Sequence, residues 1–385
     1  RNNLSALGII DGLEKNNIPM FSFDAKNIEK NTDQLVVIAG NAFSDDHVEL
    51  KKAQELNVPI VRYHTFLKNF LTKFTSIAVT GSHGKTSTTG MLAQVFSHIK
   101  PTSYLIGDGT GNGVKEAQYF IFEACEYRRH FLSYEPDYAI MVNIDFDHPD
   151  YYQSLEDVTQ AFSDFAKQVK KGIVAFGEDK QLRTLVSKTP IYYYGTSEDN
   201  DFHITDIKRC TEGSYFNVSY QGMLLGEFFV PAFGMHNIYN ATSVIAMAYL
   251  EQLPMEEVAT ALAQFSGVKR RFSEKIVKDM IIVDDYAHHP AEIKATIDGA
   301  HQRYPDKEVI AVFQPHTFTR TIALMDEFGE ALNLADYVYL CDIFASAREE
   351  HGDITIHDLA SKIKQPGCVI SEQNLSPLLN HKDAV

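Results

Sequence analysis

The segment Ser76–Thr89, with the sequence SIAVTGSHGKTSTT, constrains the fold of this chain more than any other segment. Its first part, Ser76–Thr80, predicts a buried strand, and the pattern from residue 85 to about residue 98 predicts a helix. Gly81 and Gly84 allow a sharp turn between the two, and the N-terminus of a helix attracts anions. We therefore expect a strand, a tight glycine loop and a helix that together bind phosphate.

This loop is a shortened form of the phosphate-binding P-loop, because Val79 stands where G-x-x-x-x-G-K-[ST] has its first glycine. In such a loop, Lys85 reaches the β- and γ-phosphates and the Thr86 hydroxyl binds Mg²⁺. A strand–turn–helix joint with an incidental lysine is the weaker alternative. By itself the loop indicates only a nucleotide triphosphate. The expected nucleotide contacts of the loop are Gly81, Ser82, His83, Gly84, Lys85, Thr86 and Ser87.

Composition limits the classes of function. A chain of 385 residues is expected to form two or three domains. The formal net charge of −16 argues against nucleic-acid binding, which needs clustered Lys and Arg. The four cysteines have no C-x-x-C spacing, which is typical of a reducing cytoplasm. No apolar run approaches the roughly 18–20 residues that span a membrane, and we expect a cytoplasmic protein with neither nucleic-acid nor membrane partners.

Alternating strand and helix patterns divide the chain into residues 1–73, 74–267 and 268–385. In the central segment the alternation predicts a parallel α/β sheet, which binds ligands at the carboxyl ends of its strands. Residues 202–229, with a Gln221-Gly222 turn, predict a small antiparallel insert. The principal predicted strands are 35–39, 76–80, 119–123, 139–144, 173–176, 281–284, 309–313 and 337–341, and the principal helices are 46–56, 85–98, 155–169, 237–250, 255–263, 290–303 and 319–332.

Carboxylates end two of the central strands. Glu123 closes an apolar strand, where a Mg²⁺ ligand beside a P-loop is commonly found, although a surface glutamate is about as consistent with the sequence. The next strand ends in Asp145, Asp147 and His148, which could hold a second divalent ion or form a solvated acidic turn.

Two further groups suit a nucleotide. Asn237 and Asn240 lie one helical turn apart and could bind an adenine edge, although Asn near a helix start is often a cap. Arg270 and Arg271 stand at the boundary to the last segment, where a guanidinium could reach the γ-phosphate; a charged linker is the alternative.

The last segment carries polar clusters after two successive strands. His288 and His289 follow the first strand, and His316 and Arg320 follow the second. Both clusters fall at carboxyl ends, where a substrate site is expected, and together they would form a cationic pocket for carboxylates. Each histidine taken alone is more often a structural residue.

The order of these motifs resembles that of the Mur ligases, the ATP-dependent amide-forming enzymes of peptidoglycan precursor synthesis. The shared motifs are T-G-S-H-G-K-T-S, the strand ending in Glu123, N-I-D-F-D-H, H-N-x-x-N-A and V-K-R-R-F. Three more, E-A-C-E-Y-R-R-H-F-L-S-Y, D-D-Y-A-H-H-P and F-Q-P-H-T-F-T-R-T, are similar to the branch of the family that joins L-alanine to UDP-N-acetylmuramate. The resemblance covers essentially the whole chain.

The resemblance implies an α/β protein of three domains. These are an incomplete Rossmann-like N-terminal domain that binds the UDP-sugar, a central P-loop-type ATP-binding domain, and a Rossmann-like C-terminal amino-acid domain. The family's G-x-G-x-x-G-M loop for the UDP pyrophosphate would precede Arg1, and a Gly-Ala-Gly-Asp stretch would follow Val385; we expect both to belong to sequence outside this stretch. Thr317 replaces an arginine of some relatives, so Arg320 is expected to bind more of the carboxylate.

The resemblance also implies a mechanism. The muramoyl carboxylate attacks the γ-phosphate of ATP to give an acyl phosphate, and the amine of L-alanine then displaces phosphate. Such a site must neutralise and align anions. The implied roles are Lys85 and Arg271 on the phosphates, Thr86 and Glu123 on one Mg²⁺, His148 on a second, Asn237 and Asn240 on adenine, Asp285 on ribose, and His289, His316 and Arg320 on L-alanine and the muramoyl carboxylate.

Three alternatives stay open at this point. A murein-peptide ligase of cell-wall recycling shares D-D-x-A-H-H-P, and a folylpolyglutamate-type ligase shares the central domain. A nucleotide switch would need only the P-loop and would leave the C-terminal His and Arg clusters without a role. We expect a monomer or a weak homodimer.

Overall fold

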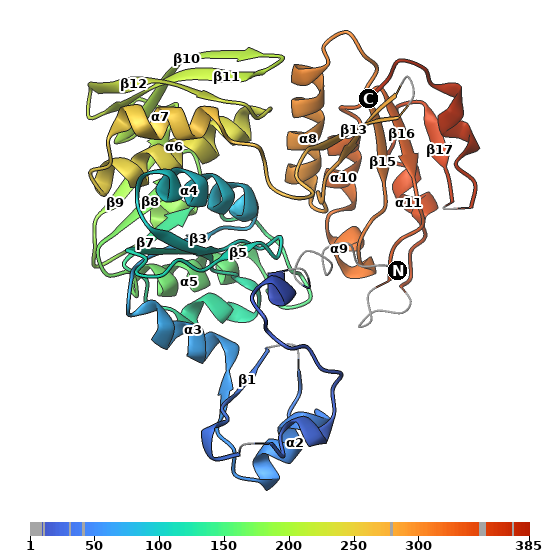
Figure 1. Cartoon of the computed structure of the whole chain (residues 1–385). Helices are drawn as coiled ribbons and strands as arrows, with labels where there is room; N and C mark the ends of the chain where they lie inside the picture. Colours follow the sequence, from blue (N-terminus) through green and yellow to red (C-terminus); the bar gives the residue numbers. More distant parts are fainter. Residues whose placement is uncertain are drawn as a thin grey trace.

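The computed structural model describes residue 10 and residues 12–30, 32–40, 43–277, 280–345, 352–371 and 373–385. Figure 1 shows a small N-terminal part, a large central part and a third part beside it. The fold is the three-domain α/β architecture that the sequence predicts.

The central part is built on a ten-stranded sheet with the strand order β12-β11-β10-β9-β8-β7-β3-β6-β4-β5. The strands from β9 to β4 are mutually parallel, as predicted. The predicted insert is antiparallel, but it extends this sheet, because β10 also pairs in parallel with β9. The strands are β3 (Thr75–Thr80), β4 (Thr102–Leu105), β5 (Gly111–Asn112), β6 (Tyr119–Glu123), β7 (Tyr138–Met141), β8 (Gly172–Phe176), β9 (Ile191–Gly195), β10 (Phe202–Cys210), β11 (Gly213–Tyr220) and β12 (Met223–Val230).

Helices cover both faces of the central sheet (Figure 1). Ile77 and Val79 of β3 belong to the core under one group of helices, whereas Ala78 between them belongs to the opposite core. Because both faces are covered, β3 is apolar at successive positions and shows no alternation. On one face lie α4 (Lys85–Ile99), α6 (Met235–Leu250) and α7 (Met255–Ala263); on the other lie α3 (Tyr63–Leu71), η3 (Tyr127–Ser133) and α5 (Leu155–Ala166).

The N-terminal part is a parallel pair of short strands with one packed helix. β1 (Val37–Ala39) pairs with β2 (Ile60–Arg62), and α2 (Val48–Glu55) contributes Ala53 to a small core. The predicted strand and helix are therefore present but shorter than expected. Short 3-10 turns, η1 (Ala25–Asn27) and η2 (Thr32–Gln34), precede β1.

The third part departs from the prediction in two places. The strand predicted at 281–284 is present as β14, but it pairs antiparallel with β13 outside the parallel sheet β15-β16-β17. The helix predicted at 319–332 is broken at Leu324, whose φ of −121° and ψ of 27° are not helical. The elements are β13 (Ser273–Val277), β14 (Met280–Asp284), α8 (Pro290–Arg303), β15 (Ile310–Phe313), α9 (Phe318–Ala323), α10 (Met325–Leu332), β16 (Tyr337–Leu340), α11 (Ile356–Ala360), β17 (Gly367–Val369) and η5 (Ser376–Asn380). Among the described residues, no helix combines the length and the apolar character needed to cross a lipid bilayer.

The Gln302 amide is one of several polar groups, with Asp298 and Arg303, that fasten α8 to the central part. The Gln302 Oε1 atom accepts hydrogen bonds from the Gly234 backbone and from Arg209 Nε, both at 2.8 Å. Its Nε2 atom donates to the carbonyl oxygens of Cys210 at 3.0 Å and Gly213 at 2.9 Å. Such a satisfied polar contact fixes where the third part lies relative to the central sheet.

We expect Gln302→Leu to destabilise the protein by about 1–3 kcal/mol, because it leaves half-buried donors and acceptors without partners. The midpoint of thermal unfolding should fall by about 2–4 °C for each kcal/mol. Gln54→Leu, at an exposed position on α2, is the matched control and should change the midpoint little. Equal midpoints for the two variants would show that the amide does not fasten α8.

Candidate active site

The phosphate loop has the backbone that its glycines allow. Gly81 has a φ of +146°, and a Cβ atom at this position would collide with the Val142 side chain. Gly84 has a φ of +80° and precedes the first residue of α4, Lys85. The loop thus connects β3 to α4 through a tight glycine turn, as the sequence predicts, and α4 begins directly after it.

The end of β7 holds this loop in place. The Asn143 side chain accepts a hydrogen bond from the His83 backbone at 2.8 Å and donates one to the His83 carbonyl at 3.1 Å. The Ser82 hydroxyl donates to the Asp145 carbonyl at 3.0 Å and accepts from the Asp145 backbone at 2.8 Å. The Ser82 N–H also donates to the Asn143 carbonyl at 3.2 Å, so the N-I-D motif fixes the loop through five hydrogen bonds.

Lys85 has an acidic partner that the sequence analysis did not identify. Its Nζ atom lies 2.9 Å from Oε2 of Glu126, which is 2% exposed. His148 Nε2 lies 3.5 Å from the other oxygen of the same carboxylate. The only sequence signal for this partner was the position of Glu126, three residues after the strand that ends in Glu123.

Burial and the neighbouring charges shift the pKa values of Lys85 and Glu126 in opposite directions. Burial lowers the pKa of Lys85, but the Glu126 carboxylate outweighs it and the pKa is raised. Burial raises the pKa of Glu126, but Lys85 and then His148 outweigh it and the pKa is lowered. Both groups are therefore ionised at neutral pH, and the Lys85 ammonium group is held by a buried carboxylate.

Oxygen donors suited to Mg²⁺ meet beside the loop. The Glu123 carboxylate accepts the Gly107 N–H at 2.5 Å and interacts with the Thr86 hydroxyl. Burial raises the pKa of Glu123, and the contacts with Gly107, Lys85 and Thr86 reduce this rise. A half-buried carboxylate next to a hydroxyl fits the hard oxygen-rich coordination of Mg²⁺.

Arg320 of the third part also meets a buried carboxylate. Its Nε and Nη2 atoms lie 3.1 Å and 2.9 Å from Oδ1 of Asp147, and both side chains are almost completely buried. Burial raises the pKa of Asp147, but His148 and Arg320 outweigh it and the pKa is lowered. The pair joins the loop after β7 to α9 across the boundary between the two parts.

Glu292 of α8 is a second acidic residue that the sequence analysis did not identify. Its carboxylate lies near Arg271, His288 and His83. Its Oε1 lies 3.2 Å from Arg271 Nη1, and its Oε2 lies 3.2 Å from His288 Nδ1. Burial raises the pKa of Glu292, but His288, His83 and Arg271 outweigh it and lower the pKa to about 2. Asp285 also approaches Arg271, at 3.8 Å, and accepts the Phe272 N–H.

Most of the candidate residues line two adjoining cavities, and Gly81, Glu123 and His289 line neither. The larger, of about 680 Å³, lies between the loop, α6 and α8, and the smaller, of about 290 Å³, lies above Lys85. His83, Gly84 and Arg271 line both. The other predicted site residues in the larger cavity are Ser87, Asn237, Asn240 and Asp285; those in the smaller are Ser82, Lys85, Thr86, His148, His316 and Arg320.

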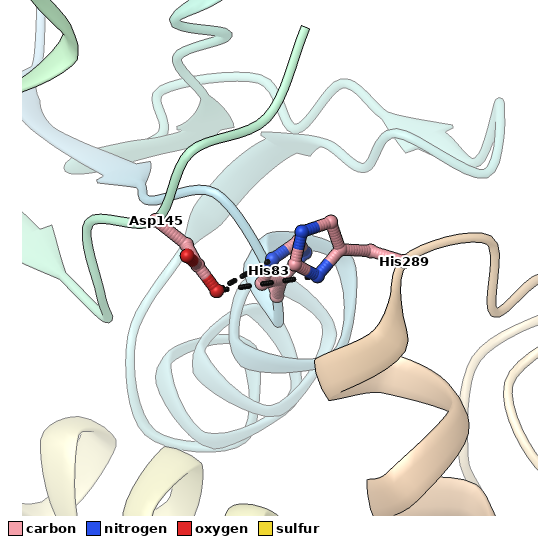
Figure 2. A group of neighbouring side chains, drawn as sticks. All are labelled: His83, Asp145 and His289. Carbon is pink, nitrogen blue, oxygen red and sulfur yellow. Dashed lines mark ion pairs between the residues drawn. The ribbon is translucent and has the colours of Figure 1, made fainter. Parts of the chain in front are cut away.

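His289 lies at the meeting point of the two parts. It begins α8, where its Nδ1 accepts the Ala291 N–H at 3.3 Å, and its ring stacks on that of His83 (Figure 2). His316 lies on the other loop of the third part, where its ring stacks against Phe344. His289 therefore lies against His83 of the loop but lines neither of the two cavities, whereas His316 lines the smaller one.

The chain is similar to known proteins in both sequence and fold. The chain matches the Mur ligase family catalytic domain over residues 7–75, the Mur ligase middle domain over residues 79–248, and the Mur ligase, glutamate ligase domain over residues 270–383. Its fold is similar to that of UDP-N-acetylmuramate-alanine ligase from Thermotoga maritima, with a TM-score of 0.76, 26% identity and coverage of 94% of this chain and 81% of that one. It also matches a murein peptide ligase from Psychrobacter arcticus, with a TM-score of 0.63, 23% identity and coverage of 96% and 84%.

Two relatives are much more similar in sequence. The UDP-N-acetylmuramate–L-alanine ligase of Levilactobacillus brevis is 57% identical over 97% of this chain and 84% of its own length. The enzyme of the same name from Lactiplantibacillus plantarum is 56% identical over 97% of this chain and 85% of its own length. With three matching domains and relatives of this identity, the chain belongs to the Mur ligase family.

Proposed function

We propose that the protein joins L-alanine to the carboxylate of UDP-N-acetylmuramate at the expense of ATP, through an acyl phosphate. The observation that carries this proposal is the smaller cavity, where the phosphate loop of the central part faces His316 and Arg320 of the third. A phosphate donor and a carboxylate acceptor can meet there. Relatives that bear the name of this reaction are 57% and 56% identical to the chain.

On the nucleotide side, the larger cavity offers amide and carboxylate groups. Asn237 and Asn240 would hold adenine, and Asp285 would accept hydrogen bonds from ribose. Lys85 and Arg271 would neutralise the phosphates, and Glu126 and Glu292 already orient these two cations in the structure. Aligned cations lower the barrier to phosphoryl transfer because they need not reorganise as charge moves.

Mg²⁺ would be held by Thr86 and Glu123, with His148 available to a second ion. When bound, Mg²⁺ would neutralise phosphate charge and bring the substrate carboxylate towards the γ-phosphate. In the structure His148 faces Glu126 and Asp147, at 3.5 Å and 3.7 Å, so these carboxylates orient its ring.

On the acceptor side, His289, His316 and Arg320 would place L-alanine and the muramoyl carboxylate. Arg320 offers further N–H groups in addition to those bonded to Asp147, since a guanidinium carries five donors. Asp147 would therefore position Arg320, and the remaining donors would bind a substrate carboxylate.

The reaction test is formation of ADP by the full-length protein with UDP-N-acetylmuramate and each candidate acceptor. We expect ADP release with L-alanine and little with a tripeptide. The opposite preference would favour the murein-peptide ligase, whose fold is also similar. ADP release that does not depend on the UDP-sugar would contradict the proposal and favour a folylpolyglutamate-type ligase.

Lys85→Ala should abolish turnover, because the γ-phosphate loses its principal cation and Glu126 becomes a buried, uncompensated carboxylate. The double variant Lys85→Ala with Glu126→Gln separates the two effects. It should recover thermal stability but not turnover. Recovery of turnover in the double variant would contradict a role for Lys85 at the phosphate.

Arg320→Ala should raise the half-saturating concentration of L-alanine or UDP-N-acetylmuramate by about ten- to a hundredfold, because a charge-assisted hydrogen bond contributes about 1.5–3 kcal/mol. ATP affinity, measured by titration without the other substrates, should barely change.

Because Arg320 also compensates Asp147, the variant Asp147→Asn with Arg320→Gln serves as the control. It removes both charges and should restore thermal stability but not substrate affinity. If ATP bound more weakly and the dependence on L-alanine and the UDP-sugar were unchanged, Arg320 would act on the nucleotide and not on the substrate carboxylates.

A further inference from the structure

Three side chains from two parts of the chain meet where the phosphate loop faces α8 (Figure 2). The His83 and His289 rings stack with centroids 4.1 Å apart and an interplanar angle of 29°. Oδ2 of Asp145 lies 3.6 Å from His83 Nε2 and 4.0 Å from His289 Nδ1. One nitrogen or oxygen atom from each of the three residues lies within 4.8 Å of the others.

Both buried histidine rings have acidic neighbours but few hydrogen bonds. Asp145 lies within 4.0 Å of both rings, and Glu292 Oε1 lies 3.9 Å from His83 Nδ1. His83 is 8% exposed and His289 is 4% exposed. Within the part of the chain that the structure describes, neither ring nitrogen of His83, nor Nε2 of His289, has a hydrogen-bond partner. Buried polar atoms without partners are uncommon and costly in folded proteins. These three ring nitrogens are therefore available to a ligand.

We infer that His83, Asp145 and His289 form a binding site for a transition-metal ion of the Zn²⁺ class. Two imidazoles and one carboxylate are a donor set typical of Zn²⁺, with a fourth position left for water. Mg²⁺ prefers oxygen ligands, so this site differs chemically from the Thr86 and Glu123 pair. His83 and His289 are also assigned to the ligase reaction, so the test for the ion is made without its substrates and its outcome is separate from that of the proposed reaction.

To bind such an ion, the three ligand atoms, which lie within 4.8 Å of one another, must move closer together. Zn–N and Zn–O bonds of about 2.0–2.1 Å in a tetrahedron place ligand atoms about 3.3 Å apart. The 3.6 Å and 4.0 Å separations must therefore contract by less than 1 Å, and one stacked ring must turn. The hydrogen bond from Ala291 to His289 Nδ1, at 3.3 Å, is long and offers weak competition.

The surroundings of Asp145 support a ligand role. Its Oδ1 accepts the Phe146 N–H at 2.9 Å, which orients the carboxylate and leaves Oδ2 facing the two rings. Such outer contacts normally fix metal ligands. Asp145 and His83 belong to the central part and His289 to the third, so a bound ion would link the phosphate loop directly to α8.

The test uses the full-length, metal-free protein without nucleotide or Mg²⁺. Co²⁺ is titrated as a spectroscopic substitute for Zn²⁺, and visible absorption is recorded per chain. We expect one equivalent to bind with the intense bands of tetrahedral Co²⁺, and Zn²⁺ to displace it. His83→Gln and the isosteric Asp145→Asn should each weaken binding by about tenfold or more, since loss of even an outer contact costs about that much.

His288→Gln is the matched control, because it removes a neighbouring imidazole outside the trio and should leave the spectrum unchanged. Circular dichroism and thermal unfolding of each variant show whether it is folded. Two outcomes would overturn the inference: only the weak bands of octahedral Co²⁺ in the parent protein, or intense bands that persist in both folded ligand variants, which would place the ion elsewhere.

Discussion

The close approach of the phosphate loop to the end of β7 is the constraint on which the rest of the site depends. Gly81 lacks the side chain that would collide with Val142, so the loop can lie directly on the neighbouring strand. The contacts of Asn143 and Asp145 with His83 and Ser82 then hold the loop in one conformation. From this fixed loop, α4 begins at Lys85, and the same strand end supplies Asp147 and His148 to the cavity.

The sequence pattern predicts a helix or strand correctly where its bounds depend only on neighbouring residues. The segment 119–123, the helix 255–263 and the helix 290–303 have the bounds that the sequence predicts, because apolar runs and flanking turn residues determine them. The break at Leu324 had no such signal, since neither proline nor glycine marks it. The antiparallel partner of β14 was likewise unpredictable, because strand pairing depends on tertiary contacts.

Within the site, residue types were predictable but their partners were not. The sequence identified Lys85, Arg271 and Arg320 through motifs. Glu126 stood in a motif without an assigned role, and Glu292 lay outside the motifs, two residues after D-D-Y-A-H-H-P. Arg320 and Asp147 are 173 residues apart, so only the folded chain shows that they pair. The proposed metal ligands His83, Asp145 and His289 were unpredictable for the same reason, because they come from three separate motifs that no spacing rule connects.

The pairing of Lys85 with Glu126 has a consequence for how an anion enters. A phosphate that takes over Lys85 leaves a carboxylate that is 2% exposed, and a buried charge without compensation is strongly unfavourable. In the proposed function, nucleotide binding would therefore be an exchange of counter-ions at Lys85 and not the filling of an empty positive pocket. Since the displaced charge must be neutralised within the same cavity, a phosphate that arrives with its own divalent cation is favoured over one that arrives bare.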